Sequence, residues 1–226
     1  MKYSKVVAID GPSGSGKSTI AKLVAQELGH VYIDTGAMFR ALGLYLSDNG
    51  IDVEDLESIQ RELHAINFEY GSNKDELVIV NGVNYTNNIR QHHVSDIASR
   101  YSKVQLIRNF LRDIQRNLVV NKFCIMEGRD IGTVIFPDAY LKISLTASDE
   151  VRAKRRQEQL ATKGEIVDFE RLVVDIKSRD ERDSNRSAAP LIKAEDAIEL
   201  LTDNLTIEQV VERIIEFVSK VNHRIE

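Results

Sequence analysis

Residues 11–19 are Gly11-Pro12-Ser13-Gly14-Ser15-Gly16-Lys17-Ser18-Thr19, which matches the pattern G-x-x-x-x-G-K-[ST] in full. The β-branched, apolar stretch Lys5–Ile9 precedes this segment, and a helical pattern follows it from Ser18 to Leu28. In such a strand–loop–helix context, glycines let backbone N–H groups converge on phosphate oxygens at a helix N-terminus. An ordinary glycine-rich turn is the alternative, and the context disfavours it. The segment therefore predicts a P-loop that binds a nucleoside triphosphate.

All nine residues of this loop are candidate triphosphate-binding residues. Lys17 supplies a point charge for the β- and γ-phosphates, and the Ser18 hydroxyl is placed to reach Mg²⁺. We therefore expect ATP as the nucleotide and Mg²⁺ as the metal, with Ser18 as its protein ligand.

The composition is that of a soluble globular protein. Apolar residues make up 42% and charged residues 29% of the 226 residues, which suits one domain carrying an insertion. The one cysteine excludes an internal disulfide and a cysteine-based zinc site. No apolar run approaches the roughly 20 residues of a membrane helix, and the N-terminal apolar stretch is too short for a signal peptide. We expect a cytoplasmic protein with no membrane partner.

The charge disfavours nucleic acid as a partner, because the formal net charge is −5. The distribution is uneven, however, since residues 151–190 hold ten Lys and Arg against eight Asp and Glu. This local excess suits a small anionic ligand.

The order of predicted elements indicates an α/β protein. A short strand at Val31–Ile33 and a helix at Ala37–Leu46 complete a βαβ opening, which predicts a parallel sheet with helices on its faces. Short strands at 67–70, 76–80 and 83–85, with Asn81-Gly82 as a turn, predict a small antiparallel insertion.

The second half of the chain returns to the parallel pattern. We predict buried strands at 123–126 and 140–145, helices at about 94–100, 103–120, 149–161 and 168–185, a strand at 197–201 and a closing helix at 206–221. The predicted fold is a three-layer P-loop NTPase fold with a five-stranded parallel sheet.

Three further segments carry candidate chemistry. Asp34-Thr35-Gly36-Ala37-Met38-Phe39-Arg40 places a hydroxyl, a glycine and an arginine where a second substrate could bind. Glu127-Gly128-Arg129-Asp130-Ile131-Gly132-Thr133 follows a buried strand, where parallel sheets place their sites. Two helical stripes carry the third set, namely Arg152, Arg155 and Arg156, and then Arg179, Arg182, Asp183 and Arg186.

These features favour a small kinase. A guanine-specific switch would show N-K-x-D, whereas Asn121-Lys122-Phe123 is followed by Cys124. Arginines suit phosphoryl transfer because a planar guanidinium binds two phosphate oxygens together.

At this point the chain resembles the bacterial cytidylate kinases, which transfer a phosphoryl group from ATP to CMP or dCMP. The resemblance runs essentially end to end and rests on residues 10–19, 34–40, 128–134 and 179–190. The segment G-R-D-I-G-T-V and the pattern R-x-x-R-D-x-x-R carry most of its specificity. The insertion near 66–86 is similar to the extension that marks the bacterial form.

The resemblance implies roles for the residues that would bind the monophosphate. Thr35 and Asp183 would hold the ribose hydroxyls of CMP, and Arg40, Arg129 and Arg179 would bind its phosphate. Ser99, Arg108 and Asp130 would recognise the cytosine, with Asp130 accepting from the exocyclic amino group.

The resemblance also implies a catalytic set and a lid. Arg186 would reach the transferring group, together with Lys17, Arg129 and Arg179 as the catalytic residues, and Arg155 and Arg156 would belong to a lid over ATP. The chain departs from the family at Glu127, where aspartate is usual, and at Thr35, where some members have serine.

The same resemblance subdivides one kinase domain over residues 1–226. We expect a core of 1–34, 103–150 and 187–226, a monophosphate-binding region at about 35–102 and a lid at about 151–186. We also expect a monomer. A relative that accepts UMP, AMP or another small hydroxyl compound is one alternative, and a regulatory module that binds ATP without turnover is another.

Overall fold

A five-stranded sheet carries the P-loop in the computed structural model, which describes residues 4–71, 77–91, 93–120, 122–162 and 164–225. The chain forms two compact units, one comprising 1–33 with 119–226 and the other 34–118. The subdivision into core, monophosphate region and lid remains a prediction, and residues 103–118, which the prediction placed in the core, group with the second unit. None of the described helices is long and apolar enough to span a lipid bilayer.

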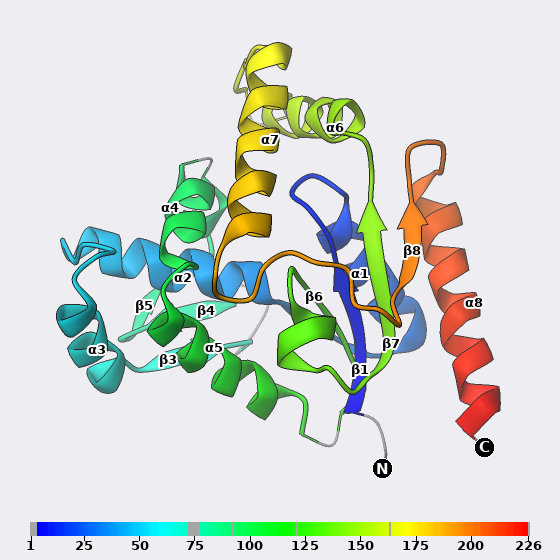
Figure 1. Cartoon of the computed structure of the whole chain (residues 1–226), viewed down its shortest axis with the longest axis horizontal. Coiled ribbons are helices and arrows are strands. Elements are labelled where there is room, and N and C mark those ends of the chain that lie inside the picture. Colours follow the sequence, from blue (N-terminus) through cyan, green and yellow to red (C-terminus); the bar gives the residue numbers. More distant parts are fainter. Residues whose placement is uncertain (1–3, 72–76, 92, 121, 163, 226) are drawn as a thin grey trace. The chain divides into compact units, whose positions relative to one another are not determined.

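The first unit has the strand order β2-β6-β1-β7-β8, which confirms the predicted five-stranded parallel sheet flanked by helices (Figure 1). Its elements are β1 (Ser4–Asp10), α1 (Lys17–Leu28), β2 (Val31–Asp34), β6 (Cys124–Gly128), the π-helical turn η2 (Ile131–Ile135), β7 (Ala139–Thr146), α6 (Asp149–Ala161), α7 (Phe169–Asn185), β8 (Ile198–Leu201) and α8 (Ile207–Ile225).

The core of this unit explains why α1 and α8 form where they do. Ile20 and Val24 of α1 and Ile214 and Val218 of α8 are buried in one cluster with the strand residues on that face of the sheet. Thr206 caps α8, because its hydroxyl accepts from the Gln209 N–H while the Gln209 side chain accepts from the Thr206 N–H. Both helices are thus fixed by an apolar stripe and a defined start.

The second unit consists of α2 (Thr35–Asp48), α3 (Leu56–Ala65), β3 (Phe68–Tyr70), β4 (Val78–Val80), β5 (Val83–Asn84), the 3₁₀ turn η1 (Asn88–Arg90), α4 (Val94–Tyr101) and α5 (Gln105–Leu118). The strands β3, β4 and β5 form the predicted antiparallel sheet. Asn81 and Gly82 both have positive φ, as a two-residue hairpin turn requires. The predicted strand at 76–80 begins outside the described residues, at residue 76.

The sequence pattern missed α3 and η2. Asp55 caps α3 by accepting from the Ser58 N–H, but Ile59 is its one fully buried residue among those described, so its apolar periodicity is weak. η2 depends on contacts with a distant strand, which local patterns do not encode.

Gly11 shows how tightly the P-loop leaves the sheet. A Cβ atom at Gly11 would lie 2.0 Å from the Leu145 carbonyl oxygen of β7, which is core backbone. Because a backbone oxygen in a packed strand moves only with the strand, residue 11 must lack a side chain.

We predict that Gly11→Ala lowers the free energy of unfolding by about 3 kcal/mol through this overlap. Gly29→Ala is the matched control, since Gly29 has φ +63° with nothing within 4 Å of its added Cβ. It should lose only about 1 kcal/mol for the left-handed backbone. Urea unfolding measures both, and a Gly11→Ala protein as stable as the Gly29→Ala protein would contradict the close approach.

Candidate phosphate-binding site

Glycines with positive φ shape the P-loop, and the Lys17 side chain folds back against one side of it. Gly14 and Gly16 have φ of +78° and +91°, and Gly16 is the N-cap of α1. The Lys17 ammonium donates to the Pro12 carbonyl at 2.7 Å and lies 3.4 Å from the Ser15 hydroxyl. The amino group that the sequence assigns to the phosphates is thus folded back over the loop.

Lys17 lies in a strongly perturbing environment. Burial, together with the cations of Arg129 and Arg179, lowers the pKa of Lys17 to about 7, although the Glu127 and Asp10 carboxylates oppose the shift. A cation held under these conditions gains more from an incoming anion than a solvated lysine would. The loop is therefore prepared for a phosphate.

Asp10 fixes the segment that follows β6. Its carboxylate accepts from the backbone N–H groups of Ile131 at 2.9 Å and Gly132 at 2.8 Å. The strand register places Asp10 beside Gly128, so the ends of β1 and β6 bring these groups together. Burial raises the pKa of Asp10 to about 6, against the lowering effect of the two N–H donors.

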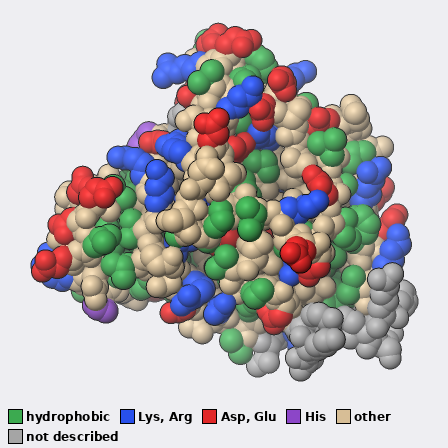
Figure 2. All heavy atoms as spheres, in the orientation of Figure 1, with side chains coloured by type: hydrophobic (Ala, Val, Ile, Leu, Met, Phe, Trp, Pro, Cys, Tyr) green, Lys and Arg blue, Asp and Glu red, His purple; other side chains and the backbone are tan. Residues whose placement is uncertain are grey.

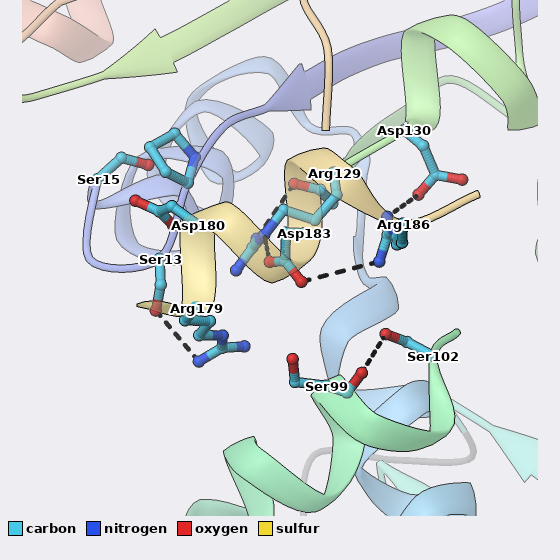
Figure 3. Close-up of polar contacts among 12 residues, drawn as sticks. Ser13, Ser15, Ser99, Ser102, Arg129, Asp130, Arg179, Asp180, Asp183 and Arg186 are labelled. Carbon is cyan, nitrogen blue, oxygen red and sulfur yellow. Dashed lines mark hydrogen bonds and ion pairs between the residues drawn. The ribbon is translucent and has the colours of Figure 1, made fainter. Parts of the chain in front are cut away.

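Four side chains, two from the segment between β6 and η2 and two from the C-terminal end of α7, form an ion-pair chain (Figure 3). Arg129 Nε donates to Asp183 at 3.1 Å, and the Arg186 guanidinium lies 3.9 Å from Asp183 and 3.8 Å from Asp130. The Arg186 Nε also donates to the Ala189 carbonyl at 2.6 Å. The structure thus brings together Arg129, Asp130, Asp183 and Arg186 from the predicted set.

Arg179 links α7 to the loop, because its guanidinium donates to the Ser13 hydroxyl at 3.2 Å (Figure 3). Burial raises the pKa of the Asp183 carboxyl, but Arg129, Arg179 and Arg186 together bring that pKa below its ordinary value. Three guanidinium groups therefore surround the Asp183 carboxylate. The cluster has spare positive charge for an anion.

The arginines of α6 differ from one another. Arg152 is 3% exposed and donates to the Ser13 carbonyl, whereas Arg155 donates to the Ser15 carbonyl and to Thr202. Arg156 donates to Gln159 of the same helix. Figure 2 shows charged side chains of both signs over the outer surfaces of α6 and α7. Contact with solvent therefore explains the charged side chains on those outer surfaces. It does not explain Arg152 and Arg155, which bond to the loop.

The second unit carries its own cluster at the start of α2. Asp34 caps α2 by accepting from the Ala37 N–H at 2.8 Å, and its other oxygen pairs with Arg40 at 3.0 Å. A Cβ atom at Gly36 would lie 3.0 Å from the Arg40 guanidinium, so the glycine leaves room for that arginine. Thr35 is buried at the first position of the helix.

Ser99 and Arg108 belong to the same unit. Arg108 is buried, donates to the Ser102 carbonyl at 3.0 Å and lies over the Phe39 ring at 5.2 Å. The Ser99 hydroxyl oxygen is buried and has no hydrogen-bond partner among the described residues, although the Ser99 carbonyl accepts from Ser102 (Figure 3). A buried hydroxyl in that condition is typical of a ligand-binding position.

Glu127 is held by a tyrosine. The Tyr32 hydroxyl of β2 donates to the buried Glu127 carboxylate at 3.0 Å. The carboxylate thus stands at the carboxyl end of β6 with a fixed orientation.

The oxygen donors of this unit suit Mg²⁺ bound mainly through phosphates. Ser18 is exposed in the first turn of α1, and hydroxyl oxygen is a hard donor. No group of three or more His, Cys, Asp or Glu side chains in the described part of the chain could hold a metal ion. Mg²⁺ commonly retains waters and binds phosphate oxygens, so this sparse donor set fits it.

Sequence reasoning gave no individual role to Asp10, Tyr32, Asp34 or Arg152, although Asp34 and Arg152 lie in segments that it singled out. Asp34 carried a usable signal, because an aspartate immediately before the first residue of a helix commonly serves as its N-cap. Asp10, Tyr32 and Arg152 act on residues more than 90 positions away, and no local pattern reveals such pairs.

The chain is similar to known kinases along nearly its whole length. A profile of the cytidylate kinase family matches residues 7–220. A cytidylate kinase of Thermosipho melanesiensis is 48% identical over 214 residues, which cover 95% of this chain and 96% of that protein. One from Fervidobacterium nodosum is 49% identical with the same coverage, and one from Fusobacterium nucleatum is 44% identical, covering 96% of this chain and 98% of that protein.

The pKa of Asp10 predicts a pH dependence of stability. Because the folded pKa is about 6 and the ordinary value 3.8, the folded state holds the proton more tightly and loses stability as pH rises through this window. We expect wild type to lose about 2 kcal/mol relative to Asp10→Asn between pH 4 and pH 7. Urea unfolding of both proteins at the two pH values measures this double difference.

The difference in stability between wild type and Asp183→Asn should depend on pH in the opposite direction. The folded pKa of Asp183 lies below its ordinary value, so wild type keeps its advantage above pH 4 and loses it as pH falls further. Asp138→Asn, at an exposed position, controls for the chemistry of the substitution. Equal pH profiles for wild type and Asp10→Asn would contradict the buried environment of Asp10.

Proposed function

The chain belongs to the cytidylate kinase family, and we propose from this that it transfers the γ-phosphoryl group of ATP to CMP or dCMP, giving ADP and CDP or dCDP. One observation carries the proposal. The P-loop lysine shares its unit with an arginine–carboxylate cluster whose cations lower the pKa of that lysine. Phosphoryl transfer is catalysed mostly by positioning and by cations around the transferring group.

The donor nucleotide is assigned to the P-loop. Backbone N–H groups within residues 11–19, apart from Pro12, which has none, would bind the α- and β-phosphates, while Lys17 would move from the Pro12 carbonyl to the β- and γ-phosphates. Mg²⁺, held by ATP phosphates and Ser18, supplies further positive charge when bound. Arg156 remains a proposed ATP contact, whereas Arg155 acts on the ATP side through its hydrogen bond to the Ser15 carbonyl of the loop.

The transferring phosphoryl group is assigned to Lys17, Arg129, Arg179 and Arg186. Arg129 is hydrogen-bonded to Asp183 and Arg186 to the Ala189 carbonyl, so their positions are set before any phosphate arrives. A phosphate competes well for these arginines because it presents more charge than a carboxylate and accepts two parallel N–H donors. The same Asp183 is then available to the ribose hydroxyls.

The acceptor CMP is assigned to two sets of side chains. The set from the second unit comprises Thr35, Arg40, Ser99 and Arg108, and the set from the first comprises Arg129, Asp130, Arg179 and Asp183. The unpartnered Ser99 hydroxyl and the fixed guanidinium of Arg108 support a polar ligand at the former set. Asp130 presents an acceptor for the cytosine amino group.

The alternatives are separated by measuring ADP release. A panel of CMP, dCMP, UMP, AMP and GMP, with a reaction lacking acceptor, identifies the substrate and detects ATP binding without turnover. The fastest release with CMP or dCMP supports the proposal, and release with none of the five would favour the regulatory module. We further propose a cytoplasmic monomer, on the composition and the family.

We predict that Lys17→Ala lowers kcat for CMP phosphorylation by about two orders of magnitude or more, as expected for loss of one transition-state donor. Lys22→Ala is the control, because Lys22 is exposed on the same helix. Steady-state kinetics with a thermal melt measure the effect. Near-normal turnover by folded Lys17→Ala protein would overturn the P-loop assignment.

We predict that Asp130→Asn narrows the ratio of kcat/KM for CMP over UMP. An ionised carboxylate only accepts, so the uracil carbonyl would face acceptor against acceptor, at a cost of roughly 1–3 kcal/mol. The wild-type preference should therefore be about tenfold to a few hundredfold, whereas the ATP KM stays nearly unchanged.

Arg186 provides the competing explanation for Asp130, since the two side chains lie 3.8 Å apart. If Asp130 serves only Arg186, Asp130→Asn lowers kcat for CMP and UMP equally and leaves their ratio at the wild-type value. Asp138→Asn, at an exposed position in the same loop, should change neither quantity.

A further inference from the structure

Helix α6 lies directly against the P-loop. A Cβ atom at Gly14 would lie 3.1 Å from the Arg152 Cβ and 3.2 Å from the Arg152 carbonyl oxygen. The loop therefore touches the backbone of α6 at Arg152. The neighbouring side chains on that face of α6 must supply hydrogen-bond partners for the polar groups of the loop.

Arg152 satisfies one of these groups. Its Nη1 donates to the Ser13 carbonyl at 2.9 Å, and its Nε donates to the Ala147 carbonyl at 3.0 Å. The rest of the guanidinium pairs with the carboxylates of Asp149 and Asp180. The side chain is thus fixed on every edge and almost fully buried.

Arg155 satisfies a second group. Its Nη1 donates to the Ser15 carbonyl at 3.3 Å and to the Thr202 hydroxyl at 3.0 Å, and its Nη2 donates to the Thr202 carbonyl at 3.0 Å. Thr202 is buried just after β8. Its hydroxyl and carbonyl oxygens accept from the Arg155 guanidinium, and its hydroxyl donates to the Thr146 carbonyl. Arg155 therefore ties the loop to the end of the sheet.

The two carbonyls determine where the following N–H groups point. In a planar trans peptide, the carbonyl of one residue and the N–H of the next point in opposite directions, and no described peptide bond is cis. A Ser13 carbonyl aimed at Arg152 therefore turns the Gly14 N–H away from α6. A Ser15 carbonyl aimed at Arg155 does the same for the Gly16 N–H.

We propose that Arg152 and Arg155 are positioning residues that hold these two peptide planes so that the N–H groups of Gly14 and Gly16 face the phosphates of the nucleotide. They act through the loop backbone and are not themselves ligands of the triphosphate. This inference rests on the proposed function only in taking ATP and ADP as ligands, and for Arg155 it replaces the expected contact with ATP.

Arginine suits this task better than lysine. One planar guanidinium donates from fixed directions to two carbonyls at once, whereas an ammonium presents a rotatable point charge. The spacing of three residues places both arginines on one face of α6. That face meets the carbonyls of Ser13 and Ser15, so both peptide planes are held with their N–H groups turned away from α6.

The ligand that distinguishes the roles is ADP. Loop N–H groups bind α- and β-phosphates, which ADP and ATP share. A positioning arginine therefore affects both nucleotides alike, whereas an arginine that contacts the γ-phosphate affects ATP alone.

The test is calorimetric titration of Arg155→Met with Mg·ADP and with Mg·ATP. We expect both dissociation constants to rise about tenfold, by similar factors. In ¹H–¹⁵N spectra, the shift of the Gly16 amide on ADP binding should be smaller than in wild type. A structural role alone would lower the melting temperature without changing this amide.

Two controls separate geometry from charge. Lys154→Met removes a positive charge from the exposed neighbouring position on α6 and should leave both dissociation constants close to wild type. Arg155→Lys keeps the charge but not the planar pair of donors, so its dissociation constants should stay elevated. Full rescue by Arg155→Lys would overturn the proposal in favour of charge alone.

Arg152 needs a compensated variant, because its removal leaves the half-buried Asp180 carboxylate without its cation. Asp180 also accepts from the Ser13 N–H, so the reference protein is Asp180→Asn alone. Relative to it, Arg152→Met combined with Asp180→Asn should weaken ADP and ATP binding together and perturb the Gly14 amide. Loss of ATP affinity with unchanged ADP affinity, in either variant, would overturn the proposal. Wild-type protein that binds neither nucleotide would instead overturn the proposed function.

Discussion

The hydrogen bonds from the Ile131 and Gly132 N–H groups to the Asp10 carboxylate are the constraint on which the catalytic end of the sheet depends. They join the end of β1, which begins the P-loop, to the turn after β6. Without a carboxylate there, two buried N–H groups would lack an acceptor. With it, the turn closes in a π-helical form that fixes the positions of Arg129 and Asp130 immediately before its start.

This constraint has an electrostatic cost that the surrounding cations offset. Asp10 is buried, which raises its pKa, yet Lys17 lies close enough to lower it, and Asp10 raises that of Lys17 in turn. The unit thus keeps a carboxylate and an ammonium apart, each engaged with backbone groups. Such an arrangement favours an anion that can take the lysine while leaving the carboxylate in place.

The sequence was sufficient for the P-loop, the parallel sheet and the small antiparallel sheet, because each depends on local periodicity or on a turn such as Asn81-Gly82. It was insufficient for α3, whose single fully buried residue gives little periodicity, and for η2, which is held by Asp10 from more than 100 residues away. The arginine stripes were visible, but the sequence could not say that Arg152 and Arg155 face the loop while Arg156 bonds within its own helix.

The partners of the arginines sort them into two kinds. Arg152 and Arg155 both bond to backbone carbonyls of the P-loop, and Arg152 also pairs with the carboxylates of Asp149 and Asp180, so these two arginines hold the loop against the rest of the unit. Arg129 bonds to a carboxylate, and Arg186 lies beside two. A phosphate is, like a carboxylate, an anion with paired acceptor oxygens, and it carries more charge, so it is able to displace that partner. The first pair therefore shapes the site before nucleotide arrives, whereas the second pair is able to transfer its hydrogen bonds to the nucleotide as the reaction proceeds.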